Sequence, residues 1–297
     1  RQKCGVFLKI RLHGPPATAV LAVWKKPLHS KRTKISLPEF KRVMTRPAFS
    51  SPRHILAFDS GIGGLGIVRA IRTLCPAVSV SYLADTAVFP YGEQDDAFLT
   101  NRIVSLLSDA IQRLRPQAVV VACNTASTLA LDALRIACPD VPFIGCVPPI
   151  RWAARTTKTH VIGLLATRAT TKRPYLSKLQ ALYAPDCTLI AHAAPGLAAC
   201  AERVFRGYAV PDDDIRAEIN GLFTRDCSAE LDTVGLGCTH YTFVLDQLRA
   251  VSPPGITWLD PAEAVARHTA TILGPLPDCA PLPEASCAWF TAEPPDS

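Results

Sequence analysis

The chain has 297 residues, of which 48% are hydrophobic and 19% charged, a balance typical of a folded protein with room for two domains. Its apolar runs are short, and none approaches the roughly 18 residues that a membrane-spanning helix requires. The net charge of +7 is concentrated in residues 1–43, which carry +10 and leave −3 for the rest. The sequence therefore predicts neither a membrane protein nor a nucleic-acid partner for the main body of the chain.

Residues 1–43 form a basic segment that precedes the first predicted strand. They hold seven of the ten lysines, and Met44, the only methionine, follows them directly. We expect translation to start naturally at Met44 and residues 1–43 to be dispensable and poorly ordered, because they offer few periodic apolar positions. The alternative is a targeting extension or a genuine basic arm, which would be the one basis for nucleic-acid binding. A secretory signal fits poorly, since the apolar stretch Thr18–Trp24 is short and two lysines follow it.

The eleven cysteines predict neither a disulfide framework nor a metal site. None is spaced as Cys-x-x-Cys, and no His pair with zinc-ligand spacing accompanies them. An odd number of cysteines without an export signal indicates reduced thiols and a cytoplasmic protein. We expect most of them to be small buried residues.

Strand-like and helix-like segments alternate from residue 54 onward. In the first half, apolar runs predict four strands separated by helices. The expected order is strand His54–Phe58, helix Gly64–Leu74, strand Val78–Leu83, helix Ala97–Arg113, strand Gln117–Ala122, helix Ser127–Ala137 and strand Val141–Val147.

Pro148 and Pro149 interrupt this series, and a similar series follows them. The proline-rich tail after the last predicted helix is expected to be irregular. The expected order in this half is strand His160–Leu165, helix Arg173–Tyr183, strand Thr188–His192, helices Ala198–Phe205 and Ile215–Phe223, strand Thr233–Leu236, helix Tyr241–Val251, strand Thr257–Leu259 and helix Ala262–Leu273.

The alternation of strands and helices predicts an α/β protein with two similar parallel-sheet domains in a pseudo-symmetric arrangement. We expect the first domain to comprise residues 53–147 and 258–275, and the second residues 148–257, with an irregular tail at 276–297. Open parallel sheets bind ligands beyond the carboxyl ends of their strands. The active site is therefore expected in the cleft between the two domains.

Two of the cysteines, Cys123 and Cys238, occupy equivalent positions in the two halves. Each follows an apolar strand and begins a polar turn, in the sequences Cys-Asn-Thr and Cys-Thr-His. At a helix N-terminus the backbone amides favour a thiolate, so we expect both thiols to have lowered pKa values. A buried structural role is the alternative for any single cysteine, but the matched pair favours chemistry.

Two thiols on opposite sides of a substrate can invert the α-carbon of an amino acid. One thiolate removes the α-proton, and the other thiol returns a proton to the opposite face. The usual alternative, pyridoxal phosphate, needs a Schiff-base lysine, and Lys158, Lys172 and Lys178 lie in segments without a phosphate-binding glycine loop. We therefore expect an amino-acid racemase that needs no cofactor.

The segment Asp59–Gly64, with the sequence Asp-Ser-Gly-Ile-Gly-Gly, ends the first predicted strand. Its glycines allow a tight turn and expose amides at the start of the next helix, where a carboxylate can bind. It lacks the full dinucleotide-binding fingerprint. Taken alone, such a segment is more often a structural turn.

Together these motifs resemble the motif series of the glutamate racemase family, over roughly residues 53–275. The resemblance implies a cytoplasmic two-domain α/β enzyme that makes D-glutamate for peptidoglycan, with glutamate as its small-molecule partner and without cofactor, metal or nucleic acid. It leaves a homodimer open. The matching blocks are Asp59–Leu65, Pro90–Gly92, Ala122–Ala126 and Leu236–Tyr241.

The resemblance also implies residue roles. Cys123, supported by Asp59, would act on D-glutamate, and Cys238, supported by His240, on L-glutamate. Glu202 would assist on the His240 side, unless it is simply an exposed helix residue. The residues that would hold the ammonium and carboxylate groups of the substrate are Asp59, Ser60, Tyr91, Gly92, Asn124, Thr125, Thr239 and His240, with Thr167 and Thr170 as further carboxylate-binding residues.

Two alternatives stay open at this point. An aspartate racemase, or another two-cysteine racemase of the same superfamily, would share the machinery, although the Cys-Asn-Thr, Cys-Thr-His and Asp-Ser-Gly sequences favour glutamate. The other alternative is a non-catalytic binding paralogue on the same fold. The presence of both Cys123 and Cys238 argues against it.

Overall fold

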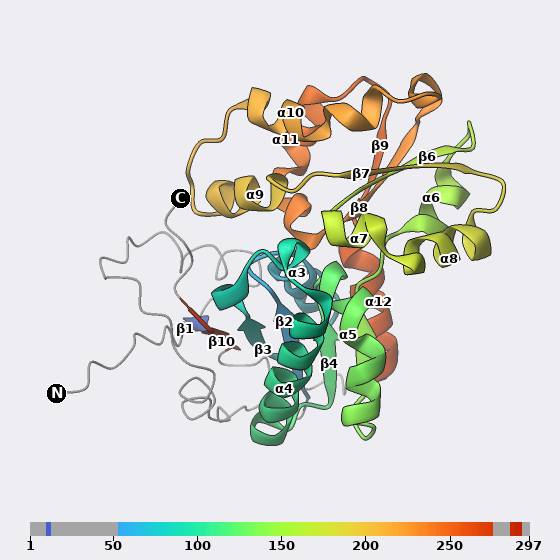
Figure 1. Ribbon diagram of the computed structural model, residues 1–297. Coiled ribbons are helices and arrows are strands. Elements are labelled where there is room, and N and C mark those ends of the chain that lie inside the picture. The colour runs from blue at the N-terminus through green and yellow to red at the C-terminus, as the bar shows by residue number, and fades with distance from the viewer. Residues whose placement is uncertain (1–9, 13–52, 276–285, 293–297) are drawn as a thin grey trace.

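The computed structural model describes residues 10–12, 53–275 and 286–292. They form two α/β domains, each built on its own β-sheet, with the second domain above the first in Figure 1. None of the helices in these ranges is long and apolar enough to cross a bilayer. The predicted fold class, two parallel-sheet α/β domains, is confirmed.

The first sheet has the strand order β1-β10-β3-β2-β4-β5, and its described neighbours are parallel except for β1 and β10. The central strand β2 is buried along its whole length, as expected for a parallel strand covered by helices on both faces. The strands are β1 (Ile10–Leu12), β2 (His54–Asp59), β3 (Ser79–Ala84), β4 (Ala118–Val121), β5 (Phe143–Gly145) and β10 (Ser286–Phe290).

Helices cover both faces of this sheet. Because side chains alternate along a strand, Ile55 of β2 packs in one core with α3 and α12, whereas Phe58 packs in another with α4 and α5. Two short 3-10 turns follow β3. The helical elements of this domain are α3 (Leu65–Leu74), η1 (Thr86–Val88), η2 (Tyr91–Glu93), α4 (Asp96–Leu114), α5 (Asn124–Ala137) and α12 (Ala262–Leu273).

The second sheet has the strand order β7-β6-β8-β9, and all of its described neighbours are parallel. One face packs against α9, α10, η4 and α11, and the other against α6 and α8. The elements are α6 (Ile150–Thr156), β6 (Val161–Ala166), α7 (Arg168–Lys172), α8 (Pro174–Tyr183), β7 (Thr188–Ala193), α9 (Leu197–Phe205), α10 (Asp212–Phe223), η3 (Ser228–Glu230), β8 (Thr233–Gly237), η4 (Thr239–Val244), α11 (Leu245–Val251) and β9 (Thr257–Leu259).

The chain passes between the domains twice, after β5 through Pro148 and Pro149, and after β9 through Pro261. The domains also contact each other through side chains. Arg173, at the start of α8, makes a two-point ion pair with Asp96 of α4, with N–O distances of 2.8 and 2.9 Å. The elements that follow the parallel strands of the two sheets meet between the domains.

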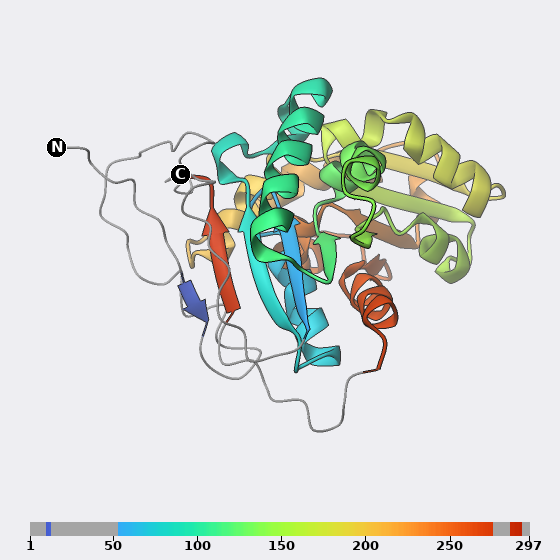
Figure 2. The same ribbon diagram turned by 90° about the horizontal axis from the view of Figure 1, so that it is seen from below.

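The structure differs from the sequence-based expectation at both ends of the chain. The sequence assigns residues 258–275 to the first domain, but β9 pairs with β8 in the second sheet. The predicted irregular tail contains β10, which lies beside β3 (Figure 2) and buries Cys287 and Trp289 against α4 and α5. Within the basic segment, β1 pairs with β10, and the rest of residues 1–43 lies outside the described residues.

Candidate active site

Cys123 lies between β4 and α5, at the carboxyl end of the first sheet. Its backbone is extended, with φ −112° and ψ 123°, and the helix begins at the next residue. The thiol is buried, with its Sγ 4.0 Å from the Oγ of Ser60. The Ser127 hydroxyl donates to the carbonyl of Val121 and accepts the amide of Cys146, so this turn is tied to the end of β5.

Cys238 occupies the matching point of the second sheet, between β8 and η4. Its Sγ lies 3.9 Å from the Nδ1 of His240, and the Nε2 of His240 lies 3.2 Å from the Oε1 of Glu202 on α9. The other carboxylate oxygen of Glu202 pairs with Arg206 at 3.1 Å. Glu202 is buried, which excludes the reading of an exposed helix residue.

The partners of His240 favour its charged form. Burial alone lowers the pKa of His240, but the hydrogen bonds to Cys238 and Glu202 and the charge of Asp59 outweigh burial and raise that pKa well above its usual value. Burial raises the pKa of Glu202, whereas His240, a backbone amide and Arg206 bring it below its usual value. At neutral pH, an imidazolium therefore stands between the Cys238 sulfur and a carboxylate.

Cys123 stands in the opposite electrostatic environment. Burial, followed by the charge of Asp59, raises the pKa of the Cys123 thiol well above its usual value. The Ala126 amide at the start of α5 does lower it, but the net lowering that the sequence predicts for this thiol is wrong because burial outweighs the amide. Burial also raises the pKa of Asp59.

The glycine-rich turn after β2 passes between catalytic candidates of both domains. The Ile62 amide donates to the Oε1 of Glu202 at 3.0 Å, which joins this turn to α9. A Cβ added to Gly63 would lie 2.5 Å from the Nδ1 of His240 and 2.7 Å from the Oδ2 of Asp59. A side chain at this position would collide with these groups, so the turn needs glycine here for close approach.

Several buried polar atoms beside the two thiols have no hydrogen-bond partner in the described structure. They are the Oδ1 of Asp59, both amide atoms of Asn124 and the Oγ1 of Thr239. Asp59 is the last residue of β2, whereas Asn124 and Thr239 follow closely after β4 and β8. Unpaired buried polar atoms are costly unless a ligand uses them, so this group is suited to hold a polar molecule between the domains.

Hydroxyl groups form a second polar surface where η2, α5 and α7 meet. The Oγ1 atoms of Thr125 and Thr167 lie 3.2 Å apart, and Thr167 donates to the Oγ1 of Thr170 at 3.1 Å. Gly92 packs closely on Thr167, since an added Cβ would lie 2.8 Å from the Thr167 Cβ. The structure therefore brings Gly92 and Thr125 of the first domain to Thr167 and Thr170 of the second.

The side-chain hydroxyl of Tyr91 is already engaged. It donates to the Oδ2 of Asp85 at 2.7 Å, and Arg102 binds both oxygens of the same carboxylate at 2.6 Å. The η2 turn itself uses the two amides that follow Gly92. Tyr91 and Gly92 can therefore bind a ligand through their own backbone amides.

Four of the side chains around this site lie outside the motifs of the sequence. Asp85 directly follows β3, much as Asp59 ends β2, and this place at the end of a strand is the one signal that could have found it. Phe89, whose ring centroid lies 5.2 Å from that of His240, carries no local signal, nor do Arg102 and Arg206. Among the residues that the structure describes, no three His, Cys, Asp or Glu side chains converge as metal ligands.

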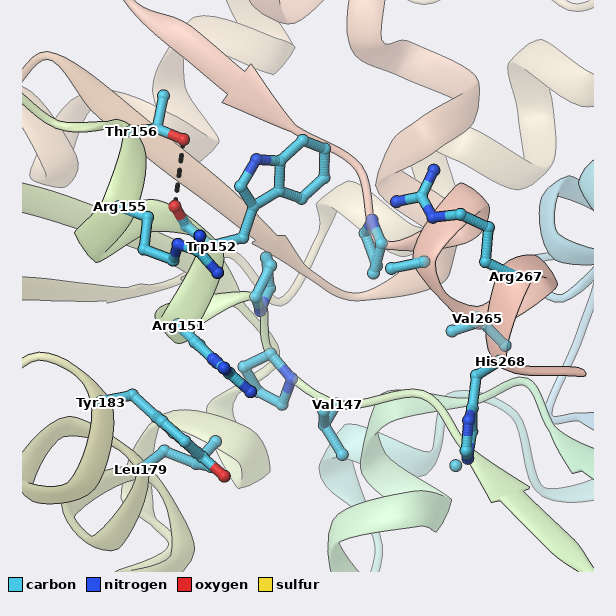
Figure 3. Close-up of a pocket in the computed structure, with 15 residues that line it drawn as sticks. Val147, Arg151, Trp152, Arg155, Thr156, Leu179, Tyr183, Val265, Arg267 and His268 are labelled. Atoms are coloured by element: carbon cyan, nitrogen blue, oxygen red, sulfur yellow. Dashed lines mark hydrogen bonds between the residues drawn. The ribbon is translucent and has the colours of Figure 1, made fainter. Parts of the chain in front are cut away.

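A separate cavity of about 970 Å³ lies where the chain crosses between the domains (Figure 3). Arg151 and Arg155 line it from α6, and Arg267 and His268 from α12. None of its lining residues is acidic. The Arg151 guanidinium lies 5.5 Å from the ring centroid of Tyr183, in cation–π contact.

Comparison with known proteins identifies the family. Residues 65–269 match the Asp/Glu/hydantoin racemase family. The chain is 52% identical over 241 residues to the glutamate racemase of Granulibacter bethesdensis, covering 80% of this chain and 85% of that protein. It is 40% identical over 252 residues to the glutamate racemase of Brucella canis, covering 84% and 91%.

Solved structures agree with these sequence matches. Escherichia coli glutamate racemase, in complex with L-glutamate and the activator UDP-MurNAc-ala, has a TM-score of 0.71 and 39% identity, covering 76% of this chain and 85% of that one. Glutamate racemase isoform RacE1 from Bacillus anthracis has a TM-score of 0.67 and 29% identity, covering 75% and 82%. The chain belongs to the Asp/Glu/hydantoin racemase family and is an isomerase, as the resemblance predicted.

Proposed function

We propose that the protein interconverts L- and D-glutamate, with Cys123 and Cys238 as the two groups that exchange the α-proton. The observation that carries this proposal is the pair of buried thiols at equivalent strand ends of the two domains. They are close enough for the charge of Cys238 to raise the pKa of the Cys123 thiol further, after burial and the charge of Asp59. Racemisation needs such an arrangement, because a proton removed from one face must be returned to the other.

The charges of the site suggest how the reaction starts from L-glutamate. The Cys238 thiolate, stabilised by the His240 imidazolium, removes the α-proton and becomes a thiol. Cys123, kept as a thiol by burial and by Asp59, gives its proton to the opposite face of the carbanion. A sulfur–hydrogen bond breaks, a carbon–hydrogen bond forms, and D-glutamate leaves a thiolate at Cys123.

The reverse direction starts from that second protonation state. The Cys123 thiolate removes the α-proton of D-glutamate, and the Cys238 thiol returns a proton to the other face. Exchange with solvent interconverts the two states of the free enzyme. Asp59, whose raised pKa arises from burial, is placed to accept or return the Cys123 proton in that exchange.

Two polar surfaces suit the two ends of glutamate. The unpaired atoms of Asn124 and Thr239 adjoin the thiols and would hold the ammonium group and the α-carboxylate. The backbone amides of Tyr91 and Gly92, with the hydroxyl groups of Thr125 and Thr167, would hold the second carboxylate. The two relatives named glutamate racemase support this substrate, and the supply of D-glutamate for peptidoglycan is the cellular role that we propose.

Circular dichroism of the purified protein with L-glutamate, L-aspartate and L-alanine in turn tests the substrate. Decay of the signal with L-glutamate alone is expected, and decay with L-aspartate alone would show an aspartate racemase. Cys123→Ala and Cys238→Ala should each abolish racemisation, whereas Cys75→Ala, which changes a buried thiol in the core under α3, should keep it. Near-normal turnover in either active-site variant would contradict the two-thiol mechanism.

The cavity between the domains supports a second, regulatory function, which we also propose. Four basic side chains around a cavity with no acidic lining favour a polyanionic ligand. Trp152 and Tyr183, which are 40% and 38% exposed, add aromatic surfaces for a base or ring. The E. coli relative binds an activator of this kind, UDP-MurNAc-ala. A ligand here would contact both segments that join the domains.

Titration of UDP-MurNAc-ala against the racemisation rate tests this second proposal, with uridine diphosphate alone as a comparison. The wild-type rate should change with the ligand. Arg151→Gln combined with Arg155→Gln should abolish that response and leave the rate without ligand unchanged. An equal response in the double variant would place the ligand elsewhere.

A further inference from the structure

The carboxylate of Asp85 is fully buried and is bound on every side by other side chains. Its Oδ2 accepts the Tyr91 hydroxyl at 2.7 Å and the Nε of Arg102 at 2.6 Å. Its Oδ1 accepts the Nη2 of Arg102 at 2.6 Å and the hydroxyl of Thr291 at 2.6 Å. Thr291 directly follows β10, so the far end of the chain completes this group.

The connection between the end of β10 and the segment after β3 extends beyond one hydrogen bond. The Thr291 amide donates to the carbonyl of Ala84, and its hydroxyl oxygen accepts the Ala87 amide at 2.9 Å. The Ala292 amide donates to the hydroxyl oxygen of Thr86 at 3.0 Å. The Thr291 hydroxyl therefore uses both its donor and its acceptor capacity on η1 and the residue before it.

The segment fixed in this way leads directly into the proposed substrate site. Tyr91 and Gly92 follow η1, and Gly92 packs on Thr167 of the second domain. The ring of Tyr91 packs against Phe58 of β2, with ring centroids 6.3 Å apart. The position of the Tyr91 and Gly92 amides is therefore set from one side by Phe58 and from the other by Asp85.

We propose that Thr291 is a positioning residue for the racemisation reaction: through Asp85 it holds Tyr91 and Gly92 where their amides bind a substrate carboxylate. The proposal rests on the proposed function for its kinetic consequence. Thr291 does not reach the reacting atoms, so its effect is on binding and not on proton transfer. The strand β10 thereby has a role in the site as well as in the core.

Removal of the Thr291 hydroxyl affects two partners at once, the buried Asp85 and the partly buried Ala87 amide. In Thr291→Val, which keeps the shape of the side chain, Asp85 loses a donor and the Ala87 amide loses its acceptor. The expected result is a rise of about tenfold in KM for both enantiomers, as for the loss of about 1.4 kcal/mol of binding, with a much smaller change in kcat. Thr291→Ser restores the hydroxyl and should restore KM.

Thr269→Val is the matched control for a purely structural effect. Thr269 is equally buried, but its hydroxyl donates only to the Val265 carbonyl of its own helix, at 2.9 Å. This variant should lower the melting temperature without changing KM. Tyr91→Phe removes the hydrogen bond to the other oxygen of Asp85 and should also raise KM. The test therefore does not depend on the folding of one variant.

Amide hydrogen exchange gives a readout that does not require glutamate turnover. Exchange of residues 86–93 should be faster in Thr291→Val than in the wild type or in Thr269→Val, with the second domain unchanged. The proposal would be overturned if Thr291→Val kept the wild-type KM together with the wild-type exchange rate of residues 86–93. It would also be overturned if Thr291→Ser raised KM as much as Thr291→Val does. Wild-type protein inactive on glutamate would instead overturn the proposed function, while the exchange result still decides the role of Thr291.

Discussion

The sharpest test of the site geometry is the replacement of Gly63 by alanine. The added Cβ would lie 2.5 Å from the Nδ1 of His240, whereas ordinary contacts begin at 3.4 Å, so neighbouring atoms must move by about 0.9 Å. The Oδ2 of Asp59 and the Oγ1 of Thr239, each 2.7 Å from the same point, block relief in two other directions. The variant therefore separates groups that serve Cys123 from groups that serve Cys238.

A displacement of about 1 Å in catalytic groups can lower a rate by about 100-fold, so we expect Gly63→Ala to reduce kcat by that order in both directions. The assay is the initial rate of circular dichroism change with L- and D-glutamate, with the melting temperature measured alongside. Because His240 is held by Glu202 as well as by Cys238, the ring cannot simply rotate away without a further loss.

Gly66→Ala is the control, three residues along the chain. An added Cβ at Gly66 meets its nearest neighbour, Thr242, at 3.5 Å, which is ordinary contact. Gly66 lies within α3, so alanine should stabilise the fold by roughly 0.5–1 kcal/mol and leave kcat unchanged. If Gly63→Ala kept kcat within about threefold of the wild type, the close packing inferred around His240 would be refuted.

Three further predictions concern the charge state, the cofactor and the basic segment. The pKa of His240 is raised above its unfolded value of about 6.5, so protonation of His240 stabilises the folded state fully below about pH 6.5. This stabilisation is lost as the pH rises through the folded pKa. The melting temperature should therefore fall between about pH 6.5 and the folded pKa in the wild type, and fall less in His240→Asn. The purified protein should lack the visible absorbance of pyridoxal phosphate, and borohydride should not inactivate it. Deletion of residues 1–43 removes β1 but leaves β10 paired with β3, so KM for glutamate should stay unchanged and the melting temperature should fall only slightly; a large rise in KM would give this segment a part in the site.

Most of the fold could be predicted because buried parallel strands appear as continuous apolar runs separated by amphipathic helices. The run before Cys123 shows this, since Ala118–Val121 is entirely buried. The strand β10 could not be predicted in the same way. It is five residues long within a proline-rich tail, and its partner β3 lies some 200 residues earlier, so only the assembled sheet reveals why its apolar residues are buried.

The site could be predicted where its chemistry follows a strand, and not where it depends on contacts between distant segments. Cys123 and Cys238 are visible because each ends an apolar run with a polar turn. The hydrogen bond between Asp85 and Thr291 joins positions 206 residues apart and leaves no local pattern. The pKa of Cys123 was predicted in the wrong direction because a helix terminus can be seen in a sequence, whereas the extent of burial cannot.

The surroundings of Cys123 and Cys238 share a topology but differ in charge, and this difference limits how the kinetics of the two directions can differ. The pKa of the Cys123 thiol is raised by burial and by Asp59, so the proposed mechanism predicts a free enzyme that holds Cys123 as a thiol, the state that accepts L-glutamate. Yet L- and D-glutamate have equal free energies in water, so kcat/KM must be the same in both directions whatever the enzyme does. The difference in charge can therefore appear only as a difference in kcat between the two directions that is matched by an equal difference in KM. At high substrate concentration it can also appear as slow interconversion of the two protonation states of the free enzyme.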